Sequence, residues 1–141
     1  MNREFDLIIY GATGFTGKLA VEYIDNNYSD LKWAIAGRNS EKLSQISNST
    51  KSKPPIFIAS SDDSNSLSEV VKKTKVIASL AGPFSKYSNE LVNQCYENNT
   101  SYVDITGENI WVRDLIDRYH KGCEDKGCLL YTSDAADEGH C

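Results

Sequence analysis

Apolar runs and amphipathic segments alternate along the chain, five of each. The apolar runs are short, rich in isoleucine, valine and alanine, and bounded by polar residues, glycine or proline, which is typical of strands buried on both faces of a sheet. They cover residues 5–10, 33–37, 56–59, 76–80 and 102–105. Strands that alternate with single covering helices pair in parallel through right-handed crossovers. The pattern therefore predicts a doubly wound α/β domain with a parallel sheet.

A helix is predicted after each of these strands. In the first helix, from about Thr16 to Asn26, the apolar residues Leu19, Ala20, Tyr23 and Ile24 recur at helical spacing. We expect this stripe to cover the sheet.

Polar residues predict where the next two helices begin. Asn39 or Ser40 can cap the second helix, which carries Leu43 and Ile46 on its apolar side. Ser66-Leu67-Ser68-Glu69 has the pattern of a capping box, in which the serine and glutamate side chains satisfy unpaired backbone amides. We therefore expect the third helix to open at this segment.

A glycine-rich turn joins the first strand to the first helix, where a nucleotide-binding α/β fold places its phosphate loop. Glycine lets backbone amides approach a pyrophosphate, and the helix amino terminus adds unpaired amides and a positive dipole end. The predicted contacts of a dinucleotide are Gly11, Thr13, Gly14, Phe15, Thr16 and Gly17. The Gly11–Gly14 spacing is one residue longer than in the commonest fingerprint, so an ordinary glycine-rich connection stays open as the alternative.

Arg38 follows the second strand directly, at the position where an acidic residue would accept hydrogen bonds from the ribose 2′-hydroxyl of NAD. A guanidinium suits the 2′-phosphate of NADP, which it can bind with two parallel charge-assisted hydrogen bonds. We therefore predict NADP (NADPH) in preference to NAD, with Arg38 and the adjacent Asn39 among the cofactor contacts. A solvated surface arginine is the alternative.

The ends of the later strands supply further candidates. Asp62 or Asp63 can accept a hydrogen bond from the adenine amino group, or can serve as a loop aspartate or a helix cap. Ala81-Gly82-Pro83 lets the backbone approach the dinucleotide, unless it is a plain turn before a helix. Asp104 ends the fifth strand at the same rim, where it can contact the nicotinamide side or cap the following helix.

Composition excludes several classes of protein. The formal charge of −5 argues against a nucleic-acid partner, which needs a basic surface. The four cysteines lack the paired spacing of a zinc site, so no metal is expected. No apolar run reaches the roughly 20 residues of a membrane span. The first residues lack the features of a secretory signal, which makes the cytoplasm the default location.

The last stretch of the chain has a different character. Residues 128–138 resemble the translation of a transposase-type sequencing adapter in one reading frame. We therefore expect residues 1–127 to form the domain and residues 128–141 to stand outside it.

Four motifs follow one another along the chain: residues 8–17 (IIYGATGFTG), 33–38 (WAIAGR), 81–84 (AGPF) and 104–108 (DITGE). In this order they resemble the saccharopine dehydrogenase-like oxidoreductases and the related trans-acting enoyl reductases, over residues 4–127. The resemblance implies an amino-terminal NADP-binding Rossmann domain, followed in the family by a larger α+β substrate domain that is missing here. It also implies lipid-related chemistry in some members, and association with lipid droplets, mitochondria or other membranes in animal members.

The favoured interpretation is an NADP-dependent oxidoreductase whose nucleotide-binding part is visible and whose substrate, a small molecule or a lipid, is unknown. The chain by itself is expected to be inactive, and its catalytic residues and oligomeric state stay unassigned. A non-catalytic NADP(H) sensor module is the alternative, since the same turn and Arg38 would serve it equally well.

Overall fold

A parallel six-stranded sheet with the strand order β3-β2-β1-β4-β5-β6 forms the centre of the computed structural model, which describes residues 3–80, 88–104 and 109–132. The strands are β1 (Phe5–Tyr10), β2 (Trp33–Gly37), β3 (Ile56–Ile58), β4 (Thr74–Ser79), β5 (Ser101–Asp104) and β6 (Leu130–Thr132). The helices are α1 (Phe15–Asn27), α2 (Ser40–Asn48), α3 (Ser64–Val71), α5 (Asn89–Glu97) and α6 (Asn109–Lys126). The predicted doubly wound α/β class is confirmed.

The strand order reverses at β1, which pairs with β2 on one side and β4 on the other. Leu7 lies opposite both Trp33 and Val76 in the two ladders, so the three strands run in step. β2 lies on one side of β1 and β4 on the other, so the carboxyl ends of β1 and β4 mark the topological switch point of the sheet. This switch point is where open α/β sheets bind their ligands.

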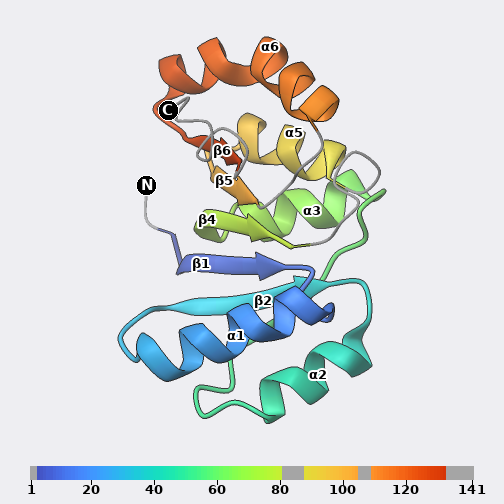
Figure 1. Cartoon of the computed structure of the whole chain (residues 1–141), viewed down its shortest axis with the longest axis vertical. Coiled ribbons are helices and arrows are strands. Elements are labelled where there is room, and N and C mark those ends of the chain that lie inside the picture. Colours follow the sequence, from blue (N-terminus) through green and yellow to red (C-terminus); the bar gives the residue numbers. More distant parts are fainter. Residues whose placement is uncertain (1–2, 81–87, 105–108, 133–141) are drawn as a thin grey trace.

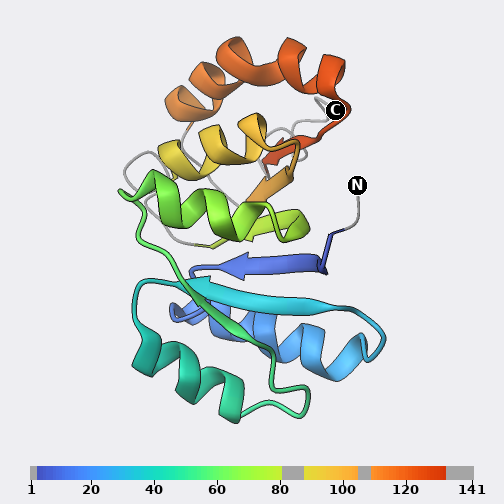
Figure 2. The same cartoon turned by 180° about the vertical axis from the view of Figure 1, so that it is seen from behind.

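Helices cover both faces of the sheet (Figures 1 and 2). α1 and α2 pack on one face, where Ile9, Ile35 and Leu43 belong to one buried cluster. α3, α5 and α6 pack on the other, where Ile77 and Tyr102 belong to a larger cluster. Among the described helices, none combines the length and the apolar composition that crossing a bilayer requires.

The predicted apolar face of α1 is wrong in part. Leu19 and Tyr23 are 52% and 57% exposed, whereas Gly17 and Val21 form the buried side of the helix. Gly17 has no side chain, so the first turn of α1 approaches the preceding loop closely and the line from Gly17 to Val21 faces the sheet. Ala20 lies beside this line and packs against the cluster.

The third helix begins earlier than its capping-box pattern predicts. Asp63 is the amino-terminal cap of α3, and its carboxylate accepts hydrogen bonds from the backbone N–H groups of Asn65 and Ser66 at 3.1 and 3.3 Å. Ser66 is therefore inside the first turn, because the aspartate three residues before it makes the capping contact first. For α2 the cap is Asn39, whose Oδ1 accepts from the N–H of Lys42 at 3.0 Å.

A sixth strand lies beyond the five predicted ones. β6 pairs in parallel with β5, with Leu130 opposite Tyr102, inside the stretch predicted to lie outside the domain. The N–H of Tyr102 donates to the carbonyl of Leu129 at 2.8 Å, which starts the ladder. The open edge of β5 offers unpaired backbone groups, and an apolar segment after α6 satisfies them. The adapter interpretation of residues 128–141 stays a prediction.

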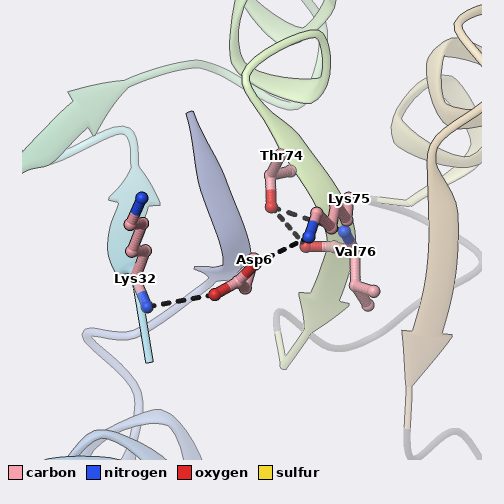
Figure 3. A network of polar contacts seen from close by, with 5 residues as sticks. All are labelled: Asp6, Lys32, Thr74, Lys75 and Val76. Carbon is pink, nitrogen blue, oxygen red and sulfur yellow. Dashed lines mark hydrogen bonds and ion pairs between the residues drawn. The ribbon is translucent and has the colours of Figure 1, made fainter. Parts of the chain in front are cut away.

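Asp6, near the amino end of β1, links this strand to β4 and to the residue that precedes β2, at the end of the sheet opposite the switch point (Figure 3). Its carboxylate forms an ion pair with Lys75 on β4 at 3.1 Å and accepts a hydrogen bond from the backbone N–H of Lys32, just before β2, at 3.3 Å. The Lys75 ammonium, followed by the Lys32 amide, lowers the pKa of Asp6 below its ordinary value of 3.8. Stability from this carboxylate is therefore present above that value and is lost as the pH falls through the lowered pKa.

We expect Lys75→Ala to raise the pKa of Asp6 and to weaken the dependence of the unfolding midpoint on pH between neutral and strongly acidic solution. The effect is small because both side chains are partly exposed. Carboxyl titration by NMR and urea unfolding at two pH values measure it. Lys72→Ala removes an exposed lysine at the end of α3 and serves as the control. An unchanged pKa of Asp6 in the Lys75 variant would contradict the assignment.

Candidate cofactor-binding site

The glycine turn leaves β1 in a conformation that requires glycine at its first position. Gly11 has a φ of 86°, in the left-handed region, and its N–H donates to the carbonyl of Ala36 on β2 at 3.1 Å. The chain then returns through Gly14, whose N–H donates to the Gly11 carbonyl at 3.4 Å, and enters α1 at Phe15. The turn therefore places the start of α1 at the carboxyl end of β1, beside the switch point.

One side of this turn is closed by backbone packing. A Cβ atom built on Gly17 would lie 2.7 Å from the Cα of Ala12 and 2.8 Å from its carbonyl carbon, and it would also collide with the Gly11 carbonyl oxygen. Real Cβ atoms essentially never approach backbone so closely, so only glycine fits at this position. The first turn of α1 is thus held against the loop.

The other side of the turn is open. A Cβ atom on Gly14 would meet only the Gly11 oxygen, at 3.9 Å. Gly14 is the cap of α1 and provides no side-chain hydrogen bond, and the first turn of the helix contains no acidic residue. The first N–H groups of a helix have no partner within the helix, so an anion on this side would meet unpaired donors and the positive end of the helix dipole. These features fit the diphosphate of a dinucleotide.

The remaining predicted turn residues differ in how exposed they are. Thr13 is half-buried, whereas Phe15 and Thr16 are exposed, Phe15 to 80%. An aromatic side chain this exposed at the first position of α1 is available to cover a bound ligand. The turn therefore brings all six predicted phosphate-loop residues to one place.

The charges of two predicted site residues, Arg38 and Asp62, both act on Tyr10, the last residue of β1. The Tyr10 hydroxyl donates to the carbonyl of Ala59, just past β3, at 3.1 Å. Burial raises the pKa of Tyr10 above 10.0, the positive charge of Arg38 opposes this rise, and the negative charge of Asp62 adds to it. Arg38 and Asp62 are both exposed and both close enough to affect the same hydroxyl. The structure thus groups them at the ends of β2 and β3.

Hydrogen bonds within the protein limit which atoms of the neighbouring polar residues can contact a cofactor. The Oδ1 of Asn39 is used as the cap of α2, which leaves its amide nitrogen for a ligand. Asp62 accepts from the Ser60 hydroxyl at 2.6 Å and stays exposed, whereas Asp63 is committed to capping α3. Of the two aspartates, Asp62 is therefore the better candidate for an adenine contact.

The predicted contacts Ala81, Gly82 and Pro83 lie outside the described residues. The segment before them is anchored at the switch point, because the N–H of Leu80 donates to the Tyr10 carbonyl at 2.8 Å. The chain enters the 81–87 segment directly beside the end of β1.

A buried polar cluster lies at the ends of β4 and β5. Its residues are predicted only in part from the sequence. The Tyr102 hydroxyl donates to Oδ2 of Asp104 at 2.6 Å, and the hydroxyls of Ser79 and Ser88 lie 3.4 Å apart. Burial and the negative charge of Asp104 raise the pKa of Tyr102 well above 10.0. Asp104 was a candidate, whereas Tyr102 was not. The signal was present, since residues two apart on a strand share one face.

Curated relatives cover the chain almost completely but are much longer. A trans-acting enoyl reductase of Mycobacterium tuberculosis is 36% identical over 131 residues, which is 91% of this chain and 31% of the relative. A lipid droplet localized protein of Caenorhabditis elegans is 34% identical over 139 residues, 92% of this chain and 33% of the relative. The chain thus spans about a third of the length of these relatives.

Solved structures share the fold at low sequence identity. Apo saccharopine dehydrogenase (L-Glu forming) from Saccharomyces cerevisiae superposes with a TM-score of 0.67 at 17% identity, over 79% of this chain and 24% of that one. The triphenylmethane reductase of Citrobacter sp., complexed with NADP(H), also has a TM-score of 0.67, at 13% identity, over 90% of this chain and 48% of that one. These similarities confirm the Rossmann-type architecture.

The family assignment rests on the sequence match. Residues 7–130 match the family described as the saccharopine dehydrogenase NADP binding domain. This description confirms the predicted preference for NADP over NAD, and the predicted resemblance to saccharopine dehydrogenase-like proteins. The chain belongs to the family of saccharopine dehydrogenase NADP-binding domains.

Proposed function

We propose that this chain is the NADPH-binding part of an oxidoreductase that transfers hydride between the cofactor and a lipid-related substrate. The observation that carries the proposal is the turn from Gly11 to Gly17, closed on one side by backbone and open on the other toward the start of α1. When bound, NADPH supplies the hydride, and the protein supplies binding, orientation and electrostatics.

Each residue of the proposed site makes one contact with the cofactor. The first backbone amides of α1 donate to the diphosphate, and the absence of an acidic side chain in that turn avoids repulsion. Arg38 pairs with the 2′-phosphate, and Asp62 accepts a hydrogen bond from the adenine amino group. Phe15 covers the bound diphosphate from the solvent side. None of these groups reacts with substrate.

The substrate class is inferred from the relatives. One is named as an enoyl reductase and another as localized to lipid droplets, which supports an acyl or other lipid-related substrate and a place of action near a lipid surface. Since the chain spans about a third of these relatives, the groups that bind substrate belong to the larger remaining part of such a protein. We expect the 141-residue chain to bind NADPH and to catalyse no reduction by itself.

Titration calorimetry and thermal melting test the proposal directly. NADPH is expected to bind with a stoichiometry of one and to raise the melting temperature, because a ligand that binds only the folded state stabilises it by about 2.7 kcal/mol at 100 times its dissociation constant. Folded chain that binds neither reduced nor oxidised nicotinamide dinucleotides would overturn the proposal.

Arg38→Ala is expected to weaken NADPH binding by about tenfold, roughly 1.4 kcal/mol, and to leave NADH binding unchanged. The reason is that a guanidinium pairs with the 2′-phosphate, which NADH lacks. Calorimetry with both cofactors measures the ratio. Arg113→Ala removes an exposed arginine from α6 and is the control. An equal loss of affinity for both cofactors would show that Arg38 does not read the 2′-phosphate.

A further inference from the structure

A groove runs between α1 and α2 on the sheet face opposite α3. It has a volume of about 620 Å³ and begins at Thr13 of the glycine turn. Its far end lies at Asp25, whose carboxylate accepts hydrogen bonds from the backbone N–H groups of Lys51 and Ser52, each at 2.9 Å. The groove is therefore continuous with the cofactor turn at one end and closed by the loop after α2 at the other.

The charges along this groove are unevenly distributed. Lys18, Lys42 and Lys51 line it, together with the carboxylates of Glu22 and Asp25. Asp25 is occupied by the loop amides at the far end. Within the described part of the chain, neither Lys18 nor Lys42 takes part in any of the ion pairs. The end of the groove next to Thr13 thus combines cationic side chains with a hydroxyl.

Lys42 occupies a particular place in this arrangement. It is in the first turn of α2, and its backbone N–H is held by the Asn39 cap at 3.0 Å, which fixes the residue relative to the end of β2. Arg38 comes from the same strand end, four residues earlier in the chain. Lys42 lines the groove on the α1 side. The two cations therefore both lie just past the carboxyl end of β2.

We propose that Lys42 is a second cation for the 2′-phosphate of NADP, reaching it from the groove that begins at Thr13, together with Arg38 at the end of β2. This inference rests on the proposed cofactor function and adds a specificity-determining residue to it. A doubly charged phosphate is satisfied better by two cations than by one, and lysine acts on it as a point charge. The Thr13 hydroxyl adds a donor at the same end of the groove.

The test compares two lysines of one groove. Lys42→Ala and Lys51→Ala each remove one positive charge, but Lys42 is in the first turn of α2, just after β2, whereas Lys51 is in the loop after α2, at the end of the groove held by Asp25. Calorimetric titration of NADPH and NADH into the 141-residue chain, at several salt concentrations, gives both affinities and their salt dependence. Alanine is the best helix former, so α2 should persist, and Lys42→Gln provides a second neutral variant that keeps most of the side chain.

We expect both neutral variants of Lys42 to weaken NADPH binding by about fivefold and to reduce its salt dependence, with NADH affinity unchanged. Lys42→Arg should restore most of the NADPH affinity, because it restores the charge. Lys51→Ala should match the unaltered chain.

Failure of the proposed cofactor function and failure of the proposed role of Lys42 give different results. If the unaltered chain binds no dinucleotide, the proposed function itself is wrong. If it binds NADPH in preference to NADH and the Lys42 and Lys51 variants behave alike, the cofactor function stands and the role of Lys42 is refuted. Loss of NADPH and NADH affinity in equal measure would also refute it, since that result indicates a general effect on the site.

Discussion

Replacing Gly17 by alanine is expected to weaken NADPH binding by roughly 100-fold, about 2.7 kcal/mol, and to destabilise the fold by about 2–3 kcal/mol. The new methyl group would lie 2.7 Å from the Cα of Ala12 and would collide with the Gly11 carbonyl. Both neighbours are backbone atoms, so relief requires that α1 move away from the turn. That movement displaces the amides proposed to hold the diphosphate and also opens the packing of Val21 on the sheet.

Gly14→Ala is the matched control for this effect. Its methyl group meets only the Gly11 oxygen at 3.9 Å, and the residue has a φ of −76°, which alanine adopts without strain. We expect its unfolding free energy to stay within about 0.5 kcal/mol of the unaltered chain. Because the methyl group points into the open side of the turn, NADPH binding should still weaken. Urea unfolding and calorimetry separate the two quantities, and equal stability of the Gly14 and Gly17 variants would contradict the packing argument.

Strand positions could be predicted because a parallel sheet buries both faces of its strands. Ile8, Ile35 and Ile77 lie in uninterrupted apolar runs and are fully buried, and the observed bounds of the five predicted strands differ from the predicted runs by at most two residues. The pattern needs no knowledge of distant contacts, since each strand supplies its own apolar signal.

The orientation of a helix is harder to predict from its own residues. The stripe through Leu19 and Tyr23 is more apolar than the line through Gly17 and Val21, yet the glycine side is buried. What decides the orientation is the close approach of α1 to the turn, which is a contact between two backbones and leaves little trace in hydrophobic periodicity. The capping role of Asp63 is hard to predict for a similar reason, because the cap of a helix is whichever side chain reaches its first free backbone amides.

Which residues of the candidate site can be predicted from the sequence depends on the same difference between local spacing and distant packing. The glycine turn and Arg38 lie within one strand–helix–strand unit, so their spacing in the sequence carries the prediction. Lys42 was not a candidate, because its place in the groove depends on how α2 packs beside α1. Tyr102 was missed because its partner Asp104 was considered as a rim residue alone, without the neighbour two positions earlier.

Tyr102→Phe is expected to lower the free energy of unfolding by about 2 kcal/mol, the usual worth of a hydrogen bond to a charged group. The hydroxyl donates to Asp104 at 2.6 Å in a buried setting, so the variant removes a donor from a carboxylate that is 5% exposed. Tyr10→Phe is the comparison: its hydroxyl donates to the neutral carbonyl of Ala59 at 3.1 Å, and about 1 kcal/mol is expected. NADPH affinity should change little, because Tyr102 lies across β4 from the glycine turn.

The dependence on pH gives this prediction a second test. Burial and the charge of Asp104 raise the pKa of Tyr102 well above 10.0, so the folded chain keeps the phenol neutral where the unfolded chain ionises it. The stabilising contribution is complete below the unfolded pKa and is lost as the pH rises beyond it, by up to about 1.4 kcal/mol per pH unit. Phenylalanine has no such proton, so the stability of the unaltered chain and that of Tyr102→Phe should converge above pH 10. A difference that stays constant between pH 8 and pH 11 in urea unfolding would show that burial and the Asp104 charge do not raise the pKa of Tyr102.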